Sequence, residues 1–335
     1  MPATGAQGAD ARRATAYRPA QPASRGGPGS DGPLGRVPPT VLILSGGISV
    51  QIGAGLAARL FTQLPAAAVT GLRLWAAALI IAAIGGRSLA PVIGGLIRDR
   101  SWHDAGIAIA FGLVLATMNY SIYQAMARIP LGIAVTIEFL GPLAVAVVTS
   151  RRLLDLLWVG LAGAGVLLLT RGGTSLAHSA RPGDTGLVVT GTLFALTAAA
   201  CWAAYIMLSR STGRRFSGSS GLVLAMIIAA IAVTPPAIAA GHAALLRPEF
   251  LAMGALIGLL SSVIPYGFEL QALRRMPTRV FGIFMSMEPA IAALVGLALL
   301  SESLQAREWV AIVFVTVASA GAARATPRAV PPPQA

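Results

Sequence analysis

The chain has 335 residues, of which 56% are apolar and only 11% are charged, and its mean hydropathy is +0.75. Soluble domains carry roughly a quarter charged residues, so this composition excludes an ordinary soluble protein and favours a membrane protein. The net charge of +13 comes from arginine without any lysine, and most arginines lie between apolar blocks, which is typical of membrane topology and argues against nucleic-acid binding.

Apolar segments dominate the chain after its first 36 residues. Residues 1–36 are rich in Pro, Gly, Ala and Arg, so we expect a disordered tail and no signal peptide. Ten segments of about 18 to 25 residues follow, long enough for helices that cross a membrane core of about 30 Å. They are Val37–Phe61, Leu64–Ile84, Asp104–Ala127, Leu131–Thr149, Leu153–Thr170, Gly186–Ser209, Gly221–Ala239, Leu251–Leu273, Val280–Leu300 and Trp309–Ala323. Residues 324–335 form a second tail. We therefore predict an all-α membrane protein with ten transmembrane helices.

The arginines predict the orientation of these helices. Ten spans place both termini on the same side of the membrane, where eighteen arginines lie, against six on the other side. Segments that carry an excess of arginine stay in the cytoplasm. We expect both termini to be cytoplasmic.

The second half of the chain repeats the first. SIYQAMARIP ends at Pro130 and GFELQALRRMP ends at Pro277, and a shift of 147 residues aligns a Gln, an Ala, an Arg and a Pro in the two motifs. The same shift aligns Pro142 with Pro289. Because five spans per repeat is an odd number, residues 37–170 and 186–323 are expected to form two inverted five-helix repeats. A secondary transporter is built in this way, with its site between the repeats.

Three ionisable residues lie inside expected spans. Arg73, Glu138 and Glu288 each cost about 2.5 to 3.5 kcal/mol or more at the membrane centre unless paired or hydrated. Either they line a transport pathway or they form internal ion pairs that fix helix packing. A pathway of this kind suits a zwitterion, because Arg73 can bind a carboxylate while a Glu binds an ammonium group or carries a coupling proton.

Further polar and aromatic residues reach similar depths. Counted from the hairpin turns, Asn119 and Tyr120 lie level with Glu138, and Tyr266 lies level with Glu288, at about 1.5 Å per residue. We therefore assign Asn119, Tyr120 and Tyr266 to the same pathway. Aromatic side chains deep in the sixth span either line the pathway or pack in the interior; they are Trp202 and Tyr205.

Three prolines predict kinks in the helices. Proline removes one helical hydrogen bond and displaces the carbonyl four residues earlier, which for Pro142 is the carbonyl of Glu138. Pro289 occupies the matching position of the second half, and Pro265 precedes Tyr266. The kinks are either hinges that line a site or static bends.

Other polar residues are expected to have structural roles. Glu269 lies near the end of the eighth span and is expected to pair with the arginines of the next hairpin. Gln124 and Gln271 of the repeat motif are expected to cap or bridge helices. Gly160 and Ala164 form a small-xxx-small pair, which indicates either packing between repeats or a homodimer.

Motifs of enzymes and cofactor sites are absent from the sequence. His103, His178 and His242 are scattered, Cys201 is the single cysteine, and neither HExxH, GxSxG, GxGD nor a phosphate loop occurs. We expect no enzymatic activity, no cofactor and no metal site. A membrane scaffold without transport is a remote alternative.

Three stretches carry a family signal: EFLGPLAVAVVTSRR from Glu138, GTLFALTAAACWAAYI from Gly191 and SMEPAIAALVGLALLSESL from Ser286. Over roughly residues 39–323 the chain resembles the drug/metabolite transporter superfamily, EamA type, and within it the bacterial threonine/homoserine exporters. The resemblance implies a multi-pass transporter in the lipid of the bacterial inner membrane. It also implies a small-molecule substrate, namely small amino acids or related metabolites. We expect export to be driven by the proton gradient or by the gradient of the substrate itself. The alternative is an exporter of drugs, aromatic compounds or other metabolites.

Overall fold

The computed structural model describes residues 36–85, 102–149, 154–170, 185–216 and 220–325. The expected tails, 1–36 and 324–335, lie outside these residues except at their inner ends. The helices of the first half are α1 (Pro39–Leu60), α2 (Ala66–Gly85), α4 (Trp102–Met126), α5 (Leu131–Glu138), α6 (Leu140–Thr149) and α7 (Leu154–Thr170). Those of the second half are α8 (Thr185–Arg215), α9 (Ser220–Gly241), η4 (His242–Leu246), α10 (Pro248–Gly258), η5 (Leu259–Val263), α11 (Ile264–Arg275), α12 (Thr278–Met285), α13 (Glu288–Leu300) and α14 (Ala306–Ala325).

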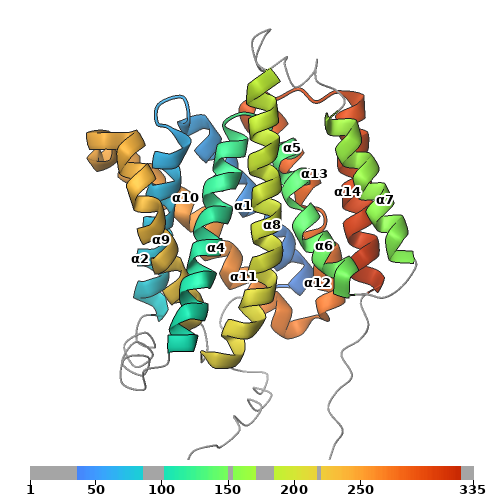
Figure 1. Ribbon diagram of the computed structural model, residues 1–335, viewed down its shortest axis with the longest axis horizontal. Coiled ribbons are helices and arrows are strands. Elements are labelled where there is room, and N and C mark those ends of the chain that lie inside the picture. Colours follow the sequence, from blue (N-terminus) through green and yellow to red (C-terminus); the bar gives the residue numbers. More distant parts are fainter. Residues whose placement is uncertain (1–35, 86–101, 150–153, 171–184, 217–219, 326–335) are drawn as a thin grey trace, which may run out of the picture. The chain divides into compact units, whose positions relative to one another are not determined.

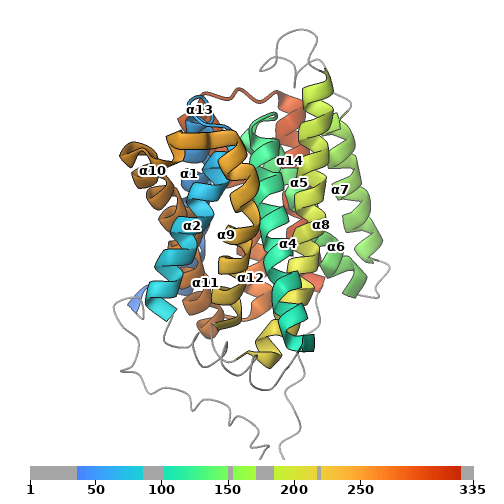
Figure 2. The ribbon, with the colours of Figure 1, turned by 60° about the vertical axis from the view of Figure 1, so that its left-hand side comes forward.

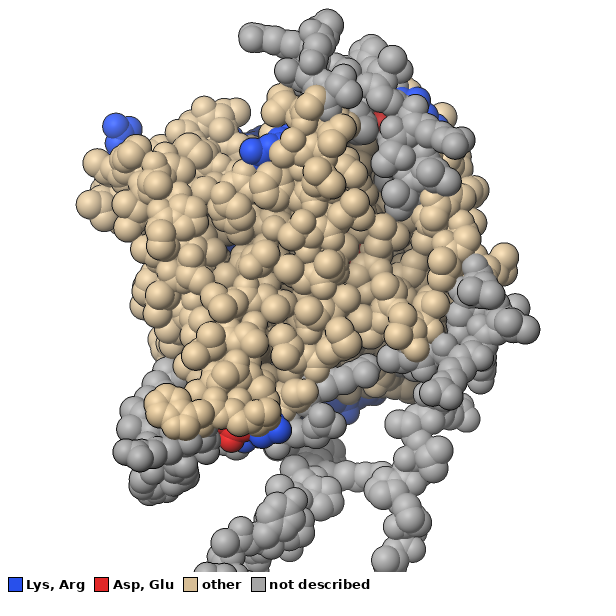
Figure 3. Space-filling model, in the orientation of Figure 1, with Lys and Arg blue, Asp and Glu red and all other residues tan. Residues whose placement is uncertain are grey.

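Every regular element of the described residues is a helix, which confirms the prediction of an all-helical membrane protein. Among the described residues, nine helical stretches are at least 18 residues long and apolar enough to cross a membrane. The expected fifth span is α7, which has 17 residues, so the tenth span stays a prediction. On the face drawn in Figure 3, the visible charged side chains lie at the two ends, and other residues form the surface between them. A lipid-facing surface requires this distribution, because a charged side chain in the hydrocarbon core of a bilayer is costly.

Two of the expected spans are each divided into a pair of helices. The fourth span consists of α5 and α6, and the ninth consists of α12 and α13. Both bounds of α12 lie 147 residues after the corresponding bounds of α5, the same shift that aligns the sequence motifs. α5 ends at Glu138, four residues before Pro142, and α12 ends at Met285, four residues before Pro289. A proline has no N–H to bond the carbonyl four residues earlier, so each helix is interrupted there.

The eighth expected span contains a π-helical turn, η5, between α10 and α11. Ser49 Oγ of α1 donates a hydrogen bond to the carbonyl oxygen of Leu260 at 2.8 Å. Gly53, one turn further along α1, lies so close to η5 that a Cβ atom there would overlap Ser261 Oγ. The π turn is therefore held directly against α1. Such turns are frequent at functional sites.

The helices of the two halves of the chain pack against each other. α4 packs against α8 and α9, and α2 packs against α9, as both views of the ribbon show (Figures 1 and 2). α14 packs against α7, α1 packs against α11 and α13, and α5 packs against α13. Each of these pairs joins a helix of the first half to one of the second half. A space between the halves is consequently lined by residues that are far apart in the sequence.

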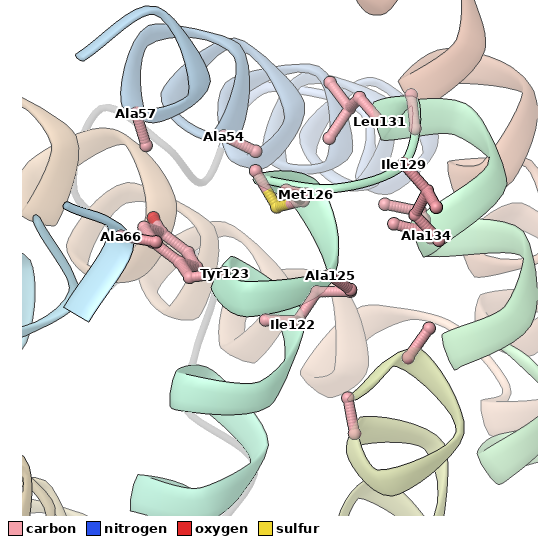
Figure 4. Packing of buried hydrophobic residues seen from close by; sticks show 14 of the residues in the cluster. Ala54, Ala57, Ala66, Ile122, Tyr123, Ala125, Met126, Ile129, Leu131 and Ala134 are labelled. Atoms are coloured by element: carbon pink, nitrogen blue, oxygen red, sulfur yellow. The ribbon is translucent and has the colours of Figure 1, made fainter. Parts of the chain in front are cut away.

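A buried apolar cluster forms where the ends of α1, α4 and α5 meet (Figure 4). Its labelled members include Ala54 and Ala57 of α1, Tyr123 and Met126 of α4, and Leu131 of α5. The alanines allow the helix backbones to approach closely, which is how membrane helices gain packing energy in the absence of a hydrophobic driving force.

Gly132 of α5 provides a test of this close packing. A Cβ atom at Gly132 would lie 2.7 Å from the Cα of Ala293 in α13, whereas a Cβ at Gly106 of α4 would meet nothing within 4 Å. We expect Gly132→Ala to push α5 and α13 apart at a cost of about 1–3 kcal/mol and to lower the melting temperature of the purified protein. Gly106→Ala is the matched control and should leave the melting temperature unchanged or raise it. Equal melting temperatures for the two variants would contradict the close approach.

Candidate functional site

A cavity of about 1000 Å³ lies between the two halves. Its lining comes from α1, α2, α4, α5 and α6 of the first half and from α8, η5, α11, α12, α13 and α14 of the second half. Among the described helices, α7, α9 and α10 contribute no lining residue. Because both halves form the walls, a movement of one half against the other would change access to the cavity.

Arg73 of α2 supplies a positive charge to the cavity. Its side chain is buried at 8% exposure, and its Nη2 donates a hydrogen bond to Asn119 Oδ1 of α4 at 2.5 Å. Asn119 Nδ2 in turn donates to the carbonyl oxygen of Leu115 at 2.7 Å, which orients the amide. The guanidinium carbon lies 5.0 Å from the centre of the Tyr123 ring. Arg73 Nε has no hydrogen-bond partner, and no described carboxylate forms an ion pair with this arginine. The cation is therefore hydrogen-bonded by a neutral amide, with the Glu138 carboxyl near enough to attract it, and it can bind an anion.

Three carboxyl side chains line the same cavity. Glu138 lies at the end of α5, Glu269 lies on α11, and Glu288 lies at the start of α13. Within the described part of the chain, none of them has a hydrogen-bond or ion-pair partner. The helix interruptions explain two of these positions, because Glu138 and Glu288 each occupy the end of a broken helix.

Aromatic residues form the other walls. The Trp202 ring lies edge-on to the Phe139 ring, with centroids 5.0 Å apart, at the junction of α5 and α6. The Tyr205 ring stacks on Phe111 at 5.1 Å. The hydroxyl groups of Tyr205 and Tyr266 interact with each other, which links α8 to α11.

The structure brings together most of the residues that the sequence assigns to the pathway. The lining includes Arg73, Asn119, Glu138, Trp202, Tyr205, Tyr266 and Glu288, and also Pro142 and Pro265. Tyr120 does not line the cavity; it packs against buried residues of α4 and α9, with its ring 6.5 Å from that of Phe194. Pro289 is buried and does not line the cavity. The transport roles of these residues stay predictions.

Sequence reasoning missed Gln51, Tyr123 and Ser261, which also line the cavity. Glu269, which the sequence assigns to pairing with nearby arginines, faces the cavity without an ion pair in the described part. A π turn adds one residue to a helical turn, so η5 rotates α11 relative to a continuous α-helix. The sequence does contain one indication of these positions, because Gln51 and Glu269 are polar residues inside otherwise apolar spans.

The paired glutamines of the repeat motif, Gln124 and Gln271, each lie beside an arginine near a helix end. Arg128 Nη1 donates to the carbonyl oxygen and the Oε1 of Gln124 at 2.6 and 2.7 Å. At the corresponding place in the second half, Arg275 Nε donates to the carbonyl oxygen of Gln271 at 3.2 Å. These arginines satisfy carbonyls in the last turns of α4 and α11. Neither glutamine lines the cavity.

The loop after α13 binds the start of α5. The backbone N–H of Leu131 donates to Glu302 Oε2 at 2.9 Å, and Arg59 Nε donates to the carbonyl oxygen of Leu299 at 2.7 Å. An acidic side chain thus caps the N-terminus of one broken helix, and a basic side chain caps the C-terminus of another.

Glu302 should make stability depend on pH. Burial raises the pKa of this carboxyl, and the hydrogen bond from Leu131 lowers it by less. A carboxyl whose pKa rises on folding adds stability below its unfolded-state pKa, and that stability is lost as the pH rises through the folded-state value. We expect Glu302→Gln, which is neutral at every pH, to remove this part of the decline. The measurement is the melting temperature of both proteins from about pH 4 to about pH 8. Parallel curves would contradict the assignment.

Known proteins resemble the chain over most of its length. The model of a family described as "EamA-like transporter family" matches residues 189–323. The threonine/homoserine exporter RhtA of Salmonella typhimurium (strain SL1344) is 38% identical over 295 residues, which are 88% of this chain and 94% of that protein. The exporter of the same name from Escherichia coli (strain K12) is 38% identical over 284 residues, which are 84% of this chain and 90% of that protein. A solved structure described only as "Crystal structure of protein" shares the fold, with a TM-score of 0.50, 16% identity, and coverage of 84% of this chain and 95% of that one.

Proposed function

Because the chain belongs to the EamA-like transporter family, we propose that it exports threonine, homoserine or a closely related small amino acid across the bacterial inner membrane. The observation that carries the proposal is the presence of one arginine and three glutamates in a single cavity between the halves. An amino acid at neutral pH carries one carboxylate and one ammonium group, so both of its charges meet an opposite charge in this cavity.

The roles of the charged residues follow from their surroundings. Arg73 binds the carboxylate of the substrate through the N–H groups that its neighbours leave free. Glu288 binds the ammonium group. Glu138 and Glu269 are the candidates for carrying the coupling proton. A carboxyl group in a membrane cavity can bind a proton when the cavity is open to one side of the membrane and release it when the cavity is open to the other.

The proposed architecture is a pair of inverted repeats, residues 37–170 and 186–323, with α7 as the tenth span and both termini in the cytoplasm. The matching bounds of α5 and α12 support the repeat, and the excess of arginines on one side supports the orientation. Gly160 of α7 has nothing within 4 Å of an added Cβ, which supports the use of its small-residue face between two copies of the chain.

One observation favours a second candidate, the export of drugs, aromatic compounds or other metabolites. The cavity volume of about 1000 Å³ is at the upper end of the range for drug-sized ligands, roughly 300–1,000 Å³, and Trp202, Tyr205 and Phe281 contribute aromatic walls. An amino acid would fill only part of this space.

Efflux from preloaded cells tests the proposal. Cells with and without the protein are loaded with labelled threonine or homoserine, and a proton uncoupler is the control. We expect faster efflux of both amino acids with the protein, and loss of that difference with the uncoupler. Faster efflux that resists the uncoupler would contradict proton coupling. No effect on either amino acid would contradict the substrate assignment and favour the second candidate.

A further inference from the structure

Gln51 of α1 is a buried polar residue with an unsatisfied acceptor. Its side chain is 2% exposed and lines the cavity, and its Oε1 has no hydrogen-bond partner in the described structure. An unsatisfied buried polar group destabilises the fold, whereas an apolar side chain of similar shape at the same place would not carry that cost. A group of this kind calls for an explanation other than stability.

Two neighbouring glycines define the side of α1 on which Gln51 lies. Gly47 and Gly55 are four residues before and after Gln51, so all three share one face of the helix. A Cβ at Gly47 would lie 3.6 Å from Glu288 Cγ, and a Cβ at Gly55 would lie 3.1 Å from Val295 Cγ1. Gln51 therefore faces α13 about one helical turn, or about 5.4 Å, from the level of Glu288.

The amide of Gln51 matches the chemistry of a hydroxyl group. An amide has both donors and an acceptor, and a hydroxyl group likewise donates one hydrogen bond and accepts others. Two other lining hydroxyls, those of Tyr123 and Ser261, also lack a hydrogen-bond partner among the described residues, but Ser261 Oγ lies against Gly53 and the Tyr123 ring lies under the Arg73 guanidinium.

We propose that Gln51 binds the side-chain hydroxyl of the substrate and thereby selects hydroxyl amino acids over their apolar isosteres. The inference rests on the proposed function, because it places the ammonium group of an amino acid on Glu288. The hydroxyl oxygens of threonine and homoserine lie only a few bonds from that ammonium group, which matches the spacing of one helical turn between Glu288 and Gln51. A site built to hydrogen-bond a hydroxyl rejects an analogue that lacks it, because the polar group of the site is then left unpaired.

The test uses the purified full-length protein in lipid vesicles, with exchange of labelled threonine as the readout. Unlabelled threonine, homoserine, valine and α-aminobutyrate compete for exchange; the last two are close analogues of the first two without the hydroxyl. We expect the wild type to prefer threonine over valine at least about tenfold, and Gln51→Met to reduce that ratio about tenfold. Gln51→Leu, a second apolar replacement, should change the ratio in the same direction.

Ser49→Ala is the matched control. Ser49 is a buried polar residue of the same helix, but it bonds the carbonyl of Leu260 and does not line the cavity, so its loss should leave the ratio unchanged. Gln51→Met and Gln51→Leu proteins that keep the wild-type ratio would overturn the role of Gln51 and leave the proposed function standing. A wild type that exchanges neither threonine nor homoserine would overturn the proposed function and this inference with it.

Discussion

An Arg73→Gln variant is expected to export threonine at least about 30-fold more slowly than the wild type. The substitution removes the positive charge that Asn119 and Tyr123 hold in place, and with it the binding energy of a buried, charge-assisted contact to the substrate carboxylate. Such contacts are worth about 2–5 kcal/mol when one partner is removed, and each 1.4 kcal/mol is a factor of ten. The measurement is the initial rate of labelled threonine efflux, normalised to the amount of protein in the membrane.

Two further substitutions separate charge from geometry at this position. Arg73→Lys keeps the charge but lacks the planar fork, so we expect a loss of about tenfold. Arg215→Gln removes an arginine whose side chain bonds Asp104 outside the cavity, and it should leave export unchanged. An Arg73→Gln protein that exports at close to the wild-type rate would exclude a role in substrate binding and leave only helix packing.

A Glu288→Gln variant is expected to lose export by about 10- to 100-fold. The amide is similar in size but carries no charge for the ammonium group, and it cannot release a proton. Because Glu288 is 7% exposed and lies at the N-terminus of α13, replacement by a neutral amide should not disturb packing. The loss should appear both in proton-driven efflux and in exchange without a proton gradient, since substrate binding is needed for each.

Proton coupling can be separated from binding with the other carboxyl groups. We expect one of the two variants, Glu138→Gln or Glu269→Gln, to abolish proton-driven efflux while it retains exchange. That variant identifies the carboxyl group that carries the coupling proton. Glu308→Gln is the control, because Glu308 is buried but accepts a hydrogen bond from the backbone N–H of Gln305 at the start of α14 and does not line the cavity. If Glu288→Gln loses only proton-driven efflux, Glu288 carries the proton and does not bind the ammonium group.

The two tyrosines of α4 show why part of the site could not be predicted. Tyr120 and Tyr123 are three residues apart in the same apolar span, and sequence depth alone favours Tyr120. In the structure Tyr120 faces Phe194, whereas Tyr123 faces Arg73 and the cavity. The face of a helix that meets the cavity is decided by its neighbours, and α4 is flanked by α8 and α9, which are distant in the sequence.

Glu269 and Gln51 show the same limit in two other helices. Both stand out in the sequence as polar residues in apolar spans, but only packing decides whether such a residue turns toward a loop arginine or toward a cavity. The π turn of η5 precedes Glu269, and the contact of Gly47 with Glu288 orients the face of α1 that carries Gln51.

The sequence alone determined that this protein is helical and crosses a membrane, because a bilayer demands long apolar segments whatever they pack against. It also identified Arg73, Glu138 and Glu288 as candidates, because a charge inside such a segment is costly enough to stand out. Only the tertiary structure decided which side chains share one cavity. The rotation of each helix and the position of each break relative to other helices are set by contacts such as those between α1 and α13 or between α4 and α8. These contacts join residues that are far apart in the sequence, such as Tyr120 with Phe194 and Gly47 with Glu288. Apolar helix surfaces that are similar all round do not specify such contacts in advance.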